Sequence, residues 1–285
     1  MTATRARASR LADVEQTTSE IMWLFGYWTG DGNIEVKEGK TEGVIRWAKV
    51  GFSTPQTDRA RGRLMETMTA LVEAEPTQRA DGYHLSWNSK ELAELFKLNG
   101  FEGKATDKRV PQWVWSLPES QRLAFIAGYL DADGTITREN RRFSLKSANH
   151  ALLEDIASLL VTLGITPRLY TEFSEPRTVR ILNYECMAHG AYRLSFPLDE
   201  RLLACISPGL REQAEACEPA KLEYYRTVGR SQIKLPESVE IVPIEVSEAS
   251  EEPVPTWDIE VEGTGNFVSQ GFIVHNSKLT MKYPA

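Results

Sequence analysis

The chain is short of cysteines. Its three cysteines, Cys186, Cys205 and Cys217, are odd in number, and none belongs to a CxxC pair. This pattern favours neither a disulfide framework nor a zinc site, so we expect buried free thiols. A CxxH pair, Cys186 with His189, is a weaker alternative because no second pair accompanies it.

Long apolar segments are also missing. No stretch reaches the roughly 18 uncharged apolar residues that a membrane span needs. The first ten residues carry three arginines and lack the apolar core of a signal peptide. We therefore expect a cytoplasmic protein without a membrane partner, whose 285 residues suffice for one large domain or two ordinary ones.

Basic residues are missing from one segment. Residues 237–276 hold nine acidic residues and no Lys or Arg, and the tail after them adds only Lys278 and Lys282. The whole chain has 33 bases and 40 acids, so residues 1–236 keep 31 of each and are neutral overall. Local basic clusters in residues 1–236 are compatible with binding to a nucleic acid, although such clusters are commonly solvated faces.

Two segments at domain-scale spacing resemble each other. Residues 21–33 read IMWLFGYWTGDGN, and residues 123–135 read LAFIAGYLDADGT. The offset of 102 residues indicates a duplicated unit of about that size. It aligns three pairs: Gly26 with Gly128, Asp31 with Asp133, and Gly32 with Gly134.

Each copy is predicted to be a helix that ends at Asp-Gly, where glycine can adopt the left-handed conformation of a helix C-terminus. Polar, β-leaning stretches follow at 34–36, 43–50, 135–138 and 142–146, and amphipathic helices at 59–72 and 148–163. The predicted class is α+β, with a leader (1–19) and two αββαββα-like halves (about 20–118 and 119–236).

From about Glu237 the pattern changes to short alternating strands, separated by glycines and by an acidic, proline-bearing linker at 247–255. This predicts a small all-β segment over 237–276, with 277–285 following it and a boundary near Pro236.

The repeated Asp-Gly helix ends suggest a metal site. A carboxylate at a helix C-terminus faces the negative end of the helix dipole, which costs a few tenths to about 1 kcal/mol. Helices packed closely through small residues would bring Asp31 and Asp133 together and add like-charge repulsion. Mg²⁺ would relieve both costs, because it takes oxygen ligands and keeps waters that can attack a phosphodiester. Two ordinary core helices are the alternative, which the domain-scale repeat disfavours.

At these residues a family resemblance becomes specific. Ile126–Gly134 (IAGYLDADG) resembles the LAGLIDADG motif, and Leu24–Gly32 (LFGYWTGDG) resembles a divergent copy. The resemblance implies a homing endonuclease that acts as a pseudo-dimeric monomer and cleaves long, specific double-stranded DNA sites with Mg²⁺. It implies that Asp31 and Asp133 are the catalytic, metal-binding carboxylates.

Two further features bear on this resemblance. Thr29 departs from the motif where the second copy has Asp131, a position that in the family supports the helix end. Lys108-Arg-Val-Pro111 resembles the Lys-x-Ile-Pro block of intein-type endonucleases, which implies that Lys108 stabilises charge on phosphate. A solvated surface lysine is the alternative. Lys234-Leu-Pro236 is a fainter echo of the same block.

The strands after each motif are expected to form a saddle over the duplex, because a two-stranded ribbon can enter the major groove. Candidates for base or phosphate contact are the basic residues in and beside these strands: Arg46, Lys49, Arg138, Arg141, Arg142 and Lys146.

The end of the chain carries a different chemistry. The side-chain amide of Asn276 can attack its own backbone carbonyl, which closes a succinimide and cleaves the following peptide bond. The imidazole of His275 can supply the hydrogen bond that this step needs, and the Ser277 hydroxyl can accept an acyl group beforehand. An ordinary β-hairpin tail is the alternative.

Residues 256–277, TWDIEVEGTGNFVSQGFIVHNS, resemble the C-terminal splicing motifs of inteins, which belong to the Hint fold. The resemblance implies that Asn276 cyclises with the assistance of His275, that Ser277 is the first C-extein residue, and that Asp258 is a nearby modulating acid. None of these splicing steps needs a cofactor.

The motif is matched incompletely. Gly265 stands where many inteins have histidine, and the N-terminal splicing residues have no room before the first Asp-Gly helix. Either the chain is the C-terminal piece of a naturally split intein, with a complementary N-terminal intein fragment, or it is a truncated reading of a longer one. Met1 with its short polar leader favours the split form. A DNA-binding relic that no longer cleaves and an RNA-binding maturase are alternatives for the endonuclease part.

Overall fold

The computed structural model describes residues 17–39, 45–72, 75–138, 141–181, 184–217, 266–269 and 272–275. The chain divides into two compact units, residues 1–221 and 222–285. The first unit contains both copies of the repeat, and within the second unit one hairpin is described. The boundary predicted near Pro236 lies outside the described residues.

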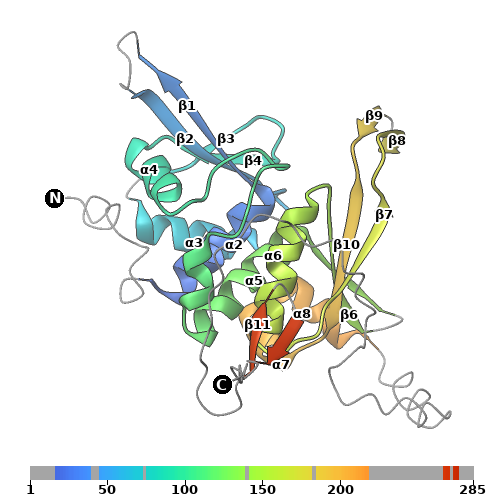
Figure 1. The fold of residues 1–285 in the computed structure, drawn as a ribbon. Coiled ribbons are helices and arrows are strands. Elements are labelled where there is room, and N and C mark those ends of the chain that lie inside the picture. Colours follow the sequence, from blue (N-terminus) through green and yellow to red (C-terminus); the bar gives the residue numbers. More distant parts are fainter. Residues whose placement is uncertain are drawn as a thin grey trace, which may run out of the picture. The chain divides into compact units, whose positions relative to one another are not determined.

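The first unit is built from two successive halves that share the order α-β-β-α-β-β-α, to which the second half adds two strands and a helix (Figure 1). The first half consists of α2 (Ser19–Asp31), β1 (Gly32–Glu38), β2 (Ile45–Ser53), α3 (Arg61–Leu71), β3 (Thr77–Gln78), β4 (His84–Trp87) and α4 (Lys90–Leu98), and the 3-10 helix η2 (Gln112–Ser116) follows it. The second half consists of α5 (Glu119–Asp133), β5 (Gly134–Thr137), β6 (Arg142–Ser147), α6 (His150–Val161), β7 (Arg168–Phe173), β8 (Arg177–Ile181), β9 (Tyr184–Ala188), β10 (Ala191–Pro197), α7 (Glu200–Cys205) and α8 (Pro208–Glu215). The predicted α+β class is confirmed.

Each half forms a four-stranded antiparallel sheet. The strand orders are β1-β2-β4-β3 and β5-β6-β10-β7, so the strands of the second sheet take the places of their counterparts in the first. The second half adds the hairpin β8–β9, which lies at the tip of the arm formed by β7 and β10 (Figure 1).

Alternation along the strands gives each sheet an apolar and a polar face. In β2, Ala48, Val50 and Phe52 are buried, whereas Lys49 lies on the opposite face. In β6, Phe143 and Leu145 are buried in the same way. The apolar faces and the helices share one hydrophobic core, so the polar faces are available for function.

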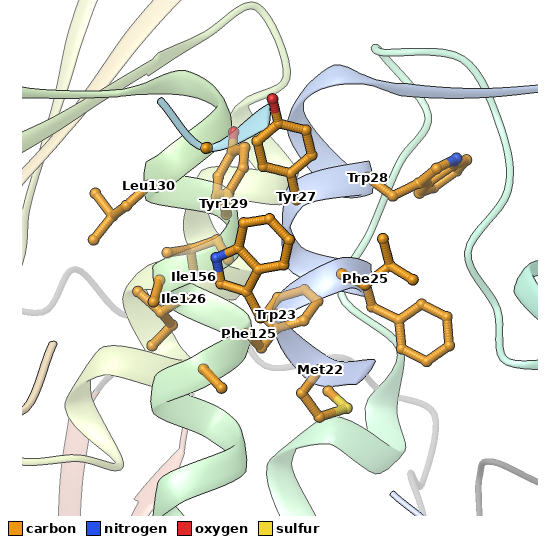
Figure 2. Packing of buried hydrophobic residues seen from close by; sticks show 14 of the residues in the cluster. Met22, Trp23, Phe25, Tyr27, Trp28, Phe125, Ile126, Tyr129, Leu130 and Ile156 are labelled. Atoms are coloured by element: carbon orange, nitrogen blue, oxygen red, sulfur yellow. The ribbon is translucent and has the colours of Figure 1, made fainter. Parts of the chain in front are cut away.

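The two repeat helices, α2 and α5, pack directly against each other in the middle of this core (Figure 2). A Cβ atom added to Gly26 would lie 1.9 Å from the carbonyl oxygen of Phe125, and one added to Gly128 would lie 1.9 Å from that of Trp23. The contact is therefore backbone against backbone and uses the same position in each copy. Both helix C-termini consequently meet at one end of the pair.

The glycines that follow the two helices serve a different purpose from the one predicted. Gly32 has φ −88° and Gly134 has φ −82°, so neither adopts the left-handed conformation, and that prediction was wrong. A Cβ atom on Gly32 would lie 2.1 Å from the Trp28 ring, and one on Gly134 would lie 2.3 Å from the Leu130 carbonyl oxygen. Lack of space, rather than backbone conformation, requires glycine at both positions.

In the second unit the structure describes the hairpin of β11 (Asn266–Ser269) and β12 (Phe272–His275), which pair antiparallel with Asn266 opposite His275. The two strands were predicted, whereas the rest of the proposed Hint segment lies outside the described residues. Across the part of the chain that the structure describes, no helix combines the length and apolarity needed to cross a membrane.

We expect Gly26→Ala to destabilise the protein by about 1–3 kcal/mol, because its new methyl group must push α2 and α5 apart. Gly62→Ala is the matched control: Gly62 lies in α3, and a Cβ atom there meets nothing within 4 Å. Alanine should stabilise that helix by up to about 1 kcal/mol. Urea unfolding measures both, and equal effects of the two changes would contradict the close packing.

Candidate active site

The C-terminal ends of α2 and α5 bring the two predicted carboxylates into one site. A Cβ atom placed on Gly30 would lie 2.6 Å from the Ala132 side chain and 3.0 Å from Oδ2 of Asp133. Asp31, the next residue, is partly exposed, and Asp133 is exposed. Both therefore lie at the surface end of a helix pair whose central part, residues 21–29 and 123–130, is buried.

The electrostatics of this site disfavour two ionised carboxylates. Burial, the charge of Asp133 and then that of Asp58 raise the pKa of Asp31 to about 8. Burial raises the pKa of Asp133 to about 6, against the opposing charge of Lys108. Solvent reaches both residues, and Asp31 lines a cavity. Repulsion and partial desolvation together prepare the site for a cation.

Lys108 lies beside the two carboxylates and is buried, with 4% of its surface exposed. The alternative of a solvated surface lysine is therefore wrong. Burial lowers the pKa of Lys108 to about 8, and the charges of Asp133 and Asp31 oppose that shift. Its ammonium donates hydrogen bonds to backbone carbonyls at the C-terminal end of α2.

The two motifs differ at Asp131 and Thr29, and neither side chain hydrogen-bonds to Asp31 or Asp133 in the described structure. Asp131 is buried and accepts hydrogen bonds from Trp23 Nε1 at 2.7 Å and from Ser207 Oγ at 2.7 Å. Its counterpart Thr29 donates instead to the Phe25 carbonyl oxygen, 2.8 Å away. Asp131 therefore links α5 to α2 and to the start of α8, so its replacement by threonine in the first copy leaves Asp31 in place.

Asp58 is a residue that sequence reasoning missed. Its carboxylate accepts hydrogen bonds from the Tyr27 hydroxyl at 2.8 Å and from the backbone N–H of Ala60 at 2.8 Å. Its charge contributes to the raised pKa of Asp31. In the sequence it is an acidic residue shortly before a helix, which signals only a cap.

The donor set fits Mg²⁺ better than a metal held by protein ligands alone. Within the described residues no group of three or more His, Cys, Asp or Glu side chains could hold a metal ion. Mg²⁺ commonly uses one or two carboxylates together with waters and substrate phosphates, and Asp31 and Asp133 supply such a pair. Cys205 and Cys217 are free thiols, and the side chain of Cys186 lies outside the description.

A cavity of about 480 Å³ opens from the carboxylate site onto the polar face of the first sheet. Asp31 and Lys108 line one end of it, and Lys49 and His84 line the sheet side. Lys49 also forms an ion pair with Glu35 at 2.9 Å. Asp31 therefore borders a polar surface large enough to receive part of an extended ligand.

The six predicted DNA-contact residues do not share one surface. Lys49, Arg142 and Lys146 lie on the polar faces of the sheets. Arg46 is exposed and lies where the register between β1 and β2 shifts, so it is outside the regular alternation that places Lys49. The remaining two lie at the turn between β5 and β6, outside the sheet faces: Arg138 and Arg141.

Two basic residues of the second polar face were missed. Arg193 of β10 pairs with Lys146 of β6 on one side and with Tyr170 of β7 on the other. Arg168 of β7 pairs with Ser195, which accepts a 2.9 Å hydrogen bond from Arg142. Alternation with the apolar residues of β10 was the signal that could have found Arg193.

Little of the predicted splicing junction falls within the described residues. His275 ends β12 and pairs with Asn266. Three predicted residues lie outside the described part of the chain: Asp258, Asn276 and Ser277.

Comparison with known proteins agrees with the repeat and the fold. A family model described as a LAGLIDADG-like domain matches residues 120–195, within the second half. A structure of mesophilic variants of the homing endonuclease I-DmoI superposes with a TM-score of 0.50 at 18% identity, covering 69% of this chain and 97% of that one. The chain thus contains a LAGLIDADG-like domain and has the fold of that endonuclease.

Two curated relatives match most of this chain but little of themselves. An iron–sulfur cluster assembly SufBD family protein of Mycobacterium leprae is 28% identical over 265 residues, which is 92% of this chain and 29% of that protein. A DNA polymerase of Thermococcus sp. is 28% identical over 274 residues, 90% of this chain and 14% of that protein. The chain therefore spans less than a third of each.

We expect Asp31→Asn to stabilise the metal-free protein increasingly as pH rises. The carboxyl ionises near pH 3.8 unperturbed and near pH 8 when folded. Between these values the folded state holds the extra proton, so stability falls with rising pH, and asparagine removes that loss. The gain should reach about 1–3 kcal/mol near pH 8, allowing for partial exposure. Urea unfolding in EDTA at pH 4, 6 and 8 measures it.

Glu66→Gln, at an exposed position of α3, is the control and should leave the pH dependence unchanged. A pH-independent difference between Asp31→Asn and wild type would contradict the charge repulsion.

Proposed function

We propose that the first unit is a metal-dependent endonuclease that cleaves a specific double-stranded DNA site. The observation that carries this proposal is the pair of carboxylates at the adjoining ends of α2 and α5, next to a polar cavity. The raised pKa values of Asp31 and Asp133 indicate a site in which a divalent cation would stabilise the ionised carboxylates. The fold of I-DmoI, itself named a homing endonuclease, supports the same reading.

Asp31 and Asp133 would hold the metal, and Mg²⁺ when bound supplies charge neutralisation and a water of lowered pKa for attack on the phosphodiester. The protein orients the two carboxylates through the rigid helix pair. Structures of I-DmoI with DNA and Ca or Mn exist; for this chain, support for a metal comes from the two carboxylates alone.

We assign DNA binding to the polar faces of the two sheets. Lys49, Arg142 and Lys146 lie there, joined by Arg168 and Arg193. Arginine and lysine on such faces can neutralise phosphates and read base edges in the major groove. Arg46, Arg138 and Arg141 are left as candidates for phosphate contact at the margins of these faces.

We further propose that the endonuclease is part of an intein. Nearly the whole chain matches segments of a SufBD family protein and of a DNA polymerase, yet it spans only 29% and 14% of them. A segment shared by proteins with such different names supports an element inserted into unrelated hosts. The residues 256–277 then carry the C-terminal splicing chemistry.

In that chemistry the Ser277 hydroxyl attacks the ester or thioester at the upstream junction, and the hydroxyl or thiol that carried the acyl group leaves. Asn276 then cyclises to a succinimide as the peptide bond to Ser277 breaks, and the freed Ser277 amine takes the acyl group from its own oxygen to form the new peptide bond. His275 donates the hydrogen bond that polarises the cleaved carbonyl, and Asp258 modulates it. The reaction partner is a complementary N-terminal splicing segment, which carries the upstream junction.

We expect the protein to nick and then linearise a plasmid that carries the uninterrupted host gene, in Mg²⁺ and not in EDTA. Asp133→Asn should slow this at least about 100-fold, because it removes a ligand charge from the site. Glu66→Gln should cleave at the wild-type rate. If wild type and Asp133→Asn are equally inert while both bind the plasmid selectively, the domain is a DNA-binding relic.

Splicing is tested by mixing the chain with an N-terminal splicing segment fused to a reporter. Mass spectrometry should detect the reporter joined to residues 277–285. Asn276→Ala should prevent release of this product, because alanine cannot cyclise, whereas Asn88→Ala at an exposed site of the first unit should splice normally. Absence of ligation at Ser277 in the wild type would refute the splicing proposal.

A further inference from the structure

The protons of the Lys108 ammonium are all engaged by the backbone. Its Nζ lies 2.7 Å from the carbonyl oxygen of Gly32, 2.9 Å from that of Trp28 and 3.1 Å from that of Thr29, with Gly30 farther away at 3.4 Å. An ammonium has three protons, so the three shorter contacts use all of them. The Trp28 ring lies 4.3 Å from Nζ. In this arrangement Lys108 has no proton left for a DNA phosphate.

The carbonyls bound by Lys108 lie on both sides of Asp31 in the sequence. Trp28 and Thr29 lie in the last turn of α2, before Asp31, and Gly32 begins β1. A cation at a helix C-terminus opposes the helix dipole, so Lys108 neutralises the end at which Asp31 and Asp133 meet. It also joins the last turn of α2 to the first residue of β1. The backbone of Asp31 is therefore held on both flanks by one side chain.

The segment that carries Lys108 is attached to the other half of the molecule. Asn149, the N-cap of α6, donates through Nδ2 to the carbonyl oxygens of Lys108 at 2.8 Å and Ala105 at 3.1 Å. Asp155 of α6 accepts from the backbone N–H of Val110 at 3.1 Å. We call residues 105–110 the strap. Through the strap, a helix of the second half positions a carboxylate of the first.

The end of α5 is built differently. Among the residues that the structure describes, no lysine or arginine donates to the carbonyls at its C-terminal end; instead Asp131 accepts from Trp23 and Ser207. Lys108 makes its contacts at the α2 end alone, so the α5 end offers an internal reference for the effect of changing that lysine.

We propose that Lys108 is a positioning residue that acts through Asp31, holding that carboxylate for the cation rather than stabilising charge on phosphate. The proposal rests on the proposed cleavage function only for its effect on rate. Its structural content, the restraint of residues 28–32, is independent of metal and DNA.

Hydrogen exchange of the full metal-free chain tests that restraint. Lys108→Gln should speed exchange of the Gly32 amide, which bonds to the Trp28 carbonyl, by about 10-fold or more, whereas the equivalent Gly134 amide should change little. Lys97→Gln, an exposed lysine in the last turn of α4, should change neither. Unchanged exchange at Gly32, or equal acceleration at Gly32 and Gly134, would overturn the proposal.

Calorimetric titration with Mg²⁺ and single-turnover cleavage then separate positioning from catalysis. Lys108→Gln should weaken Mg²⁺ binding about 10-fold or more, as loss of a supporting contact does, while cleavage at saturating Mg²⁺ stays within a few-fold of wild type. Unchanged Mg²⁺ binding with a large loss of the saturating rate would assign Lys108 to the phosphate and overturn the proposal.

Asp155→Asn provides a second variant should Lys108→Gln fail to fold. It loosens the strap and touches neither carboxylate, so it should reproduce the exchange and Mg²⁺ effects in weaker form; wild-type behaviour would count against the strap. Lys108→Gln can change exchange at Gly32 as expected while the wild-type chain neither binds Mg²⁺ nor cleaves DNA. That result would refute the proposed function and leave the restraint of residues 28–32 by Lys108 intact.

Discussion

The structure depends on one close approach, that of α2 to α5 through Gly26 and Gly128. The backbones of the two helices touch, and the contact uses the same position in each copy. Because the helices touch at equivalent positions, their C-terminal ends lie side by side, and this brings Asp31 and Asp133 together. The two sheets extend from these ends, because β1 and β5 begin at the residue after each helix.

Such an arrangement places negative charge where a helix tolerates it least. Two carboxylates and the terminal carbonyls of two helices meet at one end of the pair, and Asp58 adds a further charge. Within the described residues, a buried ammonium bonds to the end of α2, and Asp131 near the end of α5 accepts hydrogen bonds from Trp23 and Ser207. The remaining repulsion is what a bound cation would relieve.

The repeat, the fold class and the meeting of Asp31 with Asp133 were predictable, because they follow from local pattern and from the offset between the copies. The face on which a basic side chain lies was less predictable, because the register of β1 with β2 shifts at Arg46 and regular alternation does not extend to that residue. The burial of Lys108 was not predictable from its neighbours, since its partners lie about 80 residues earlier in the chain. The role of Asp58 was not predictable for the same reason, since its partner Tyr27 lies 31 residues earlier in the chain.

The strap has a consequence for recombining the two halves. Two halves that meet through one helix pair suggest that either half can be exchanged for that of another protein. The helix pair is not the whole contact between the halves, because Asn149 and Asp155 of the second half also hold the segment that carries Lys108. A hybrid with a different second half would therefore need residues equivalent to Asn149 and Asp155. Without them, the strap would be unattached and Asp31 would lose the support of Lys108.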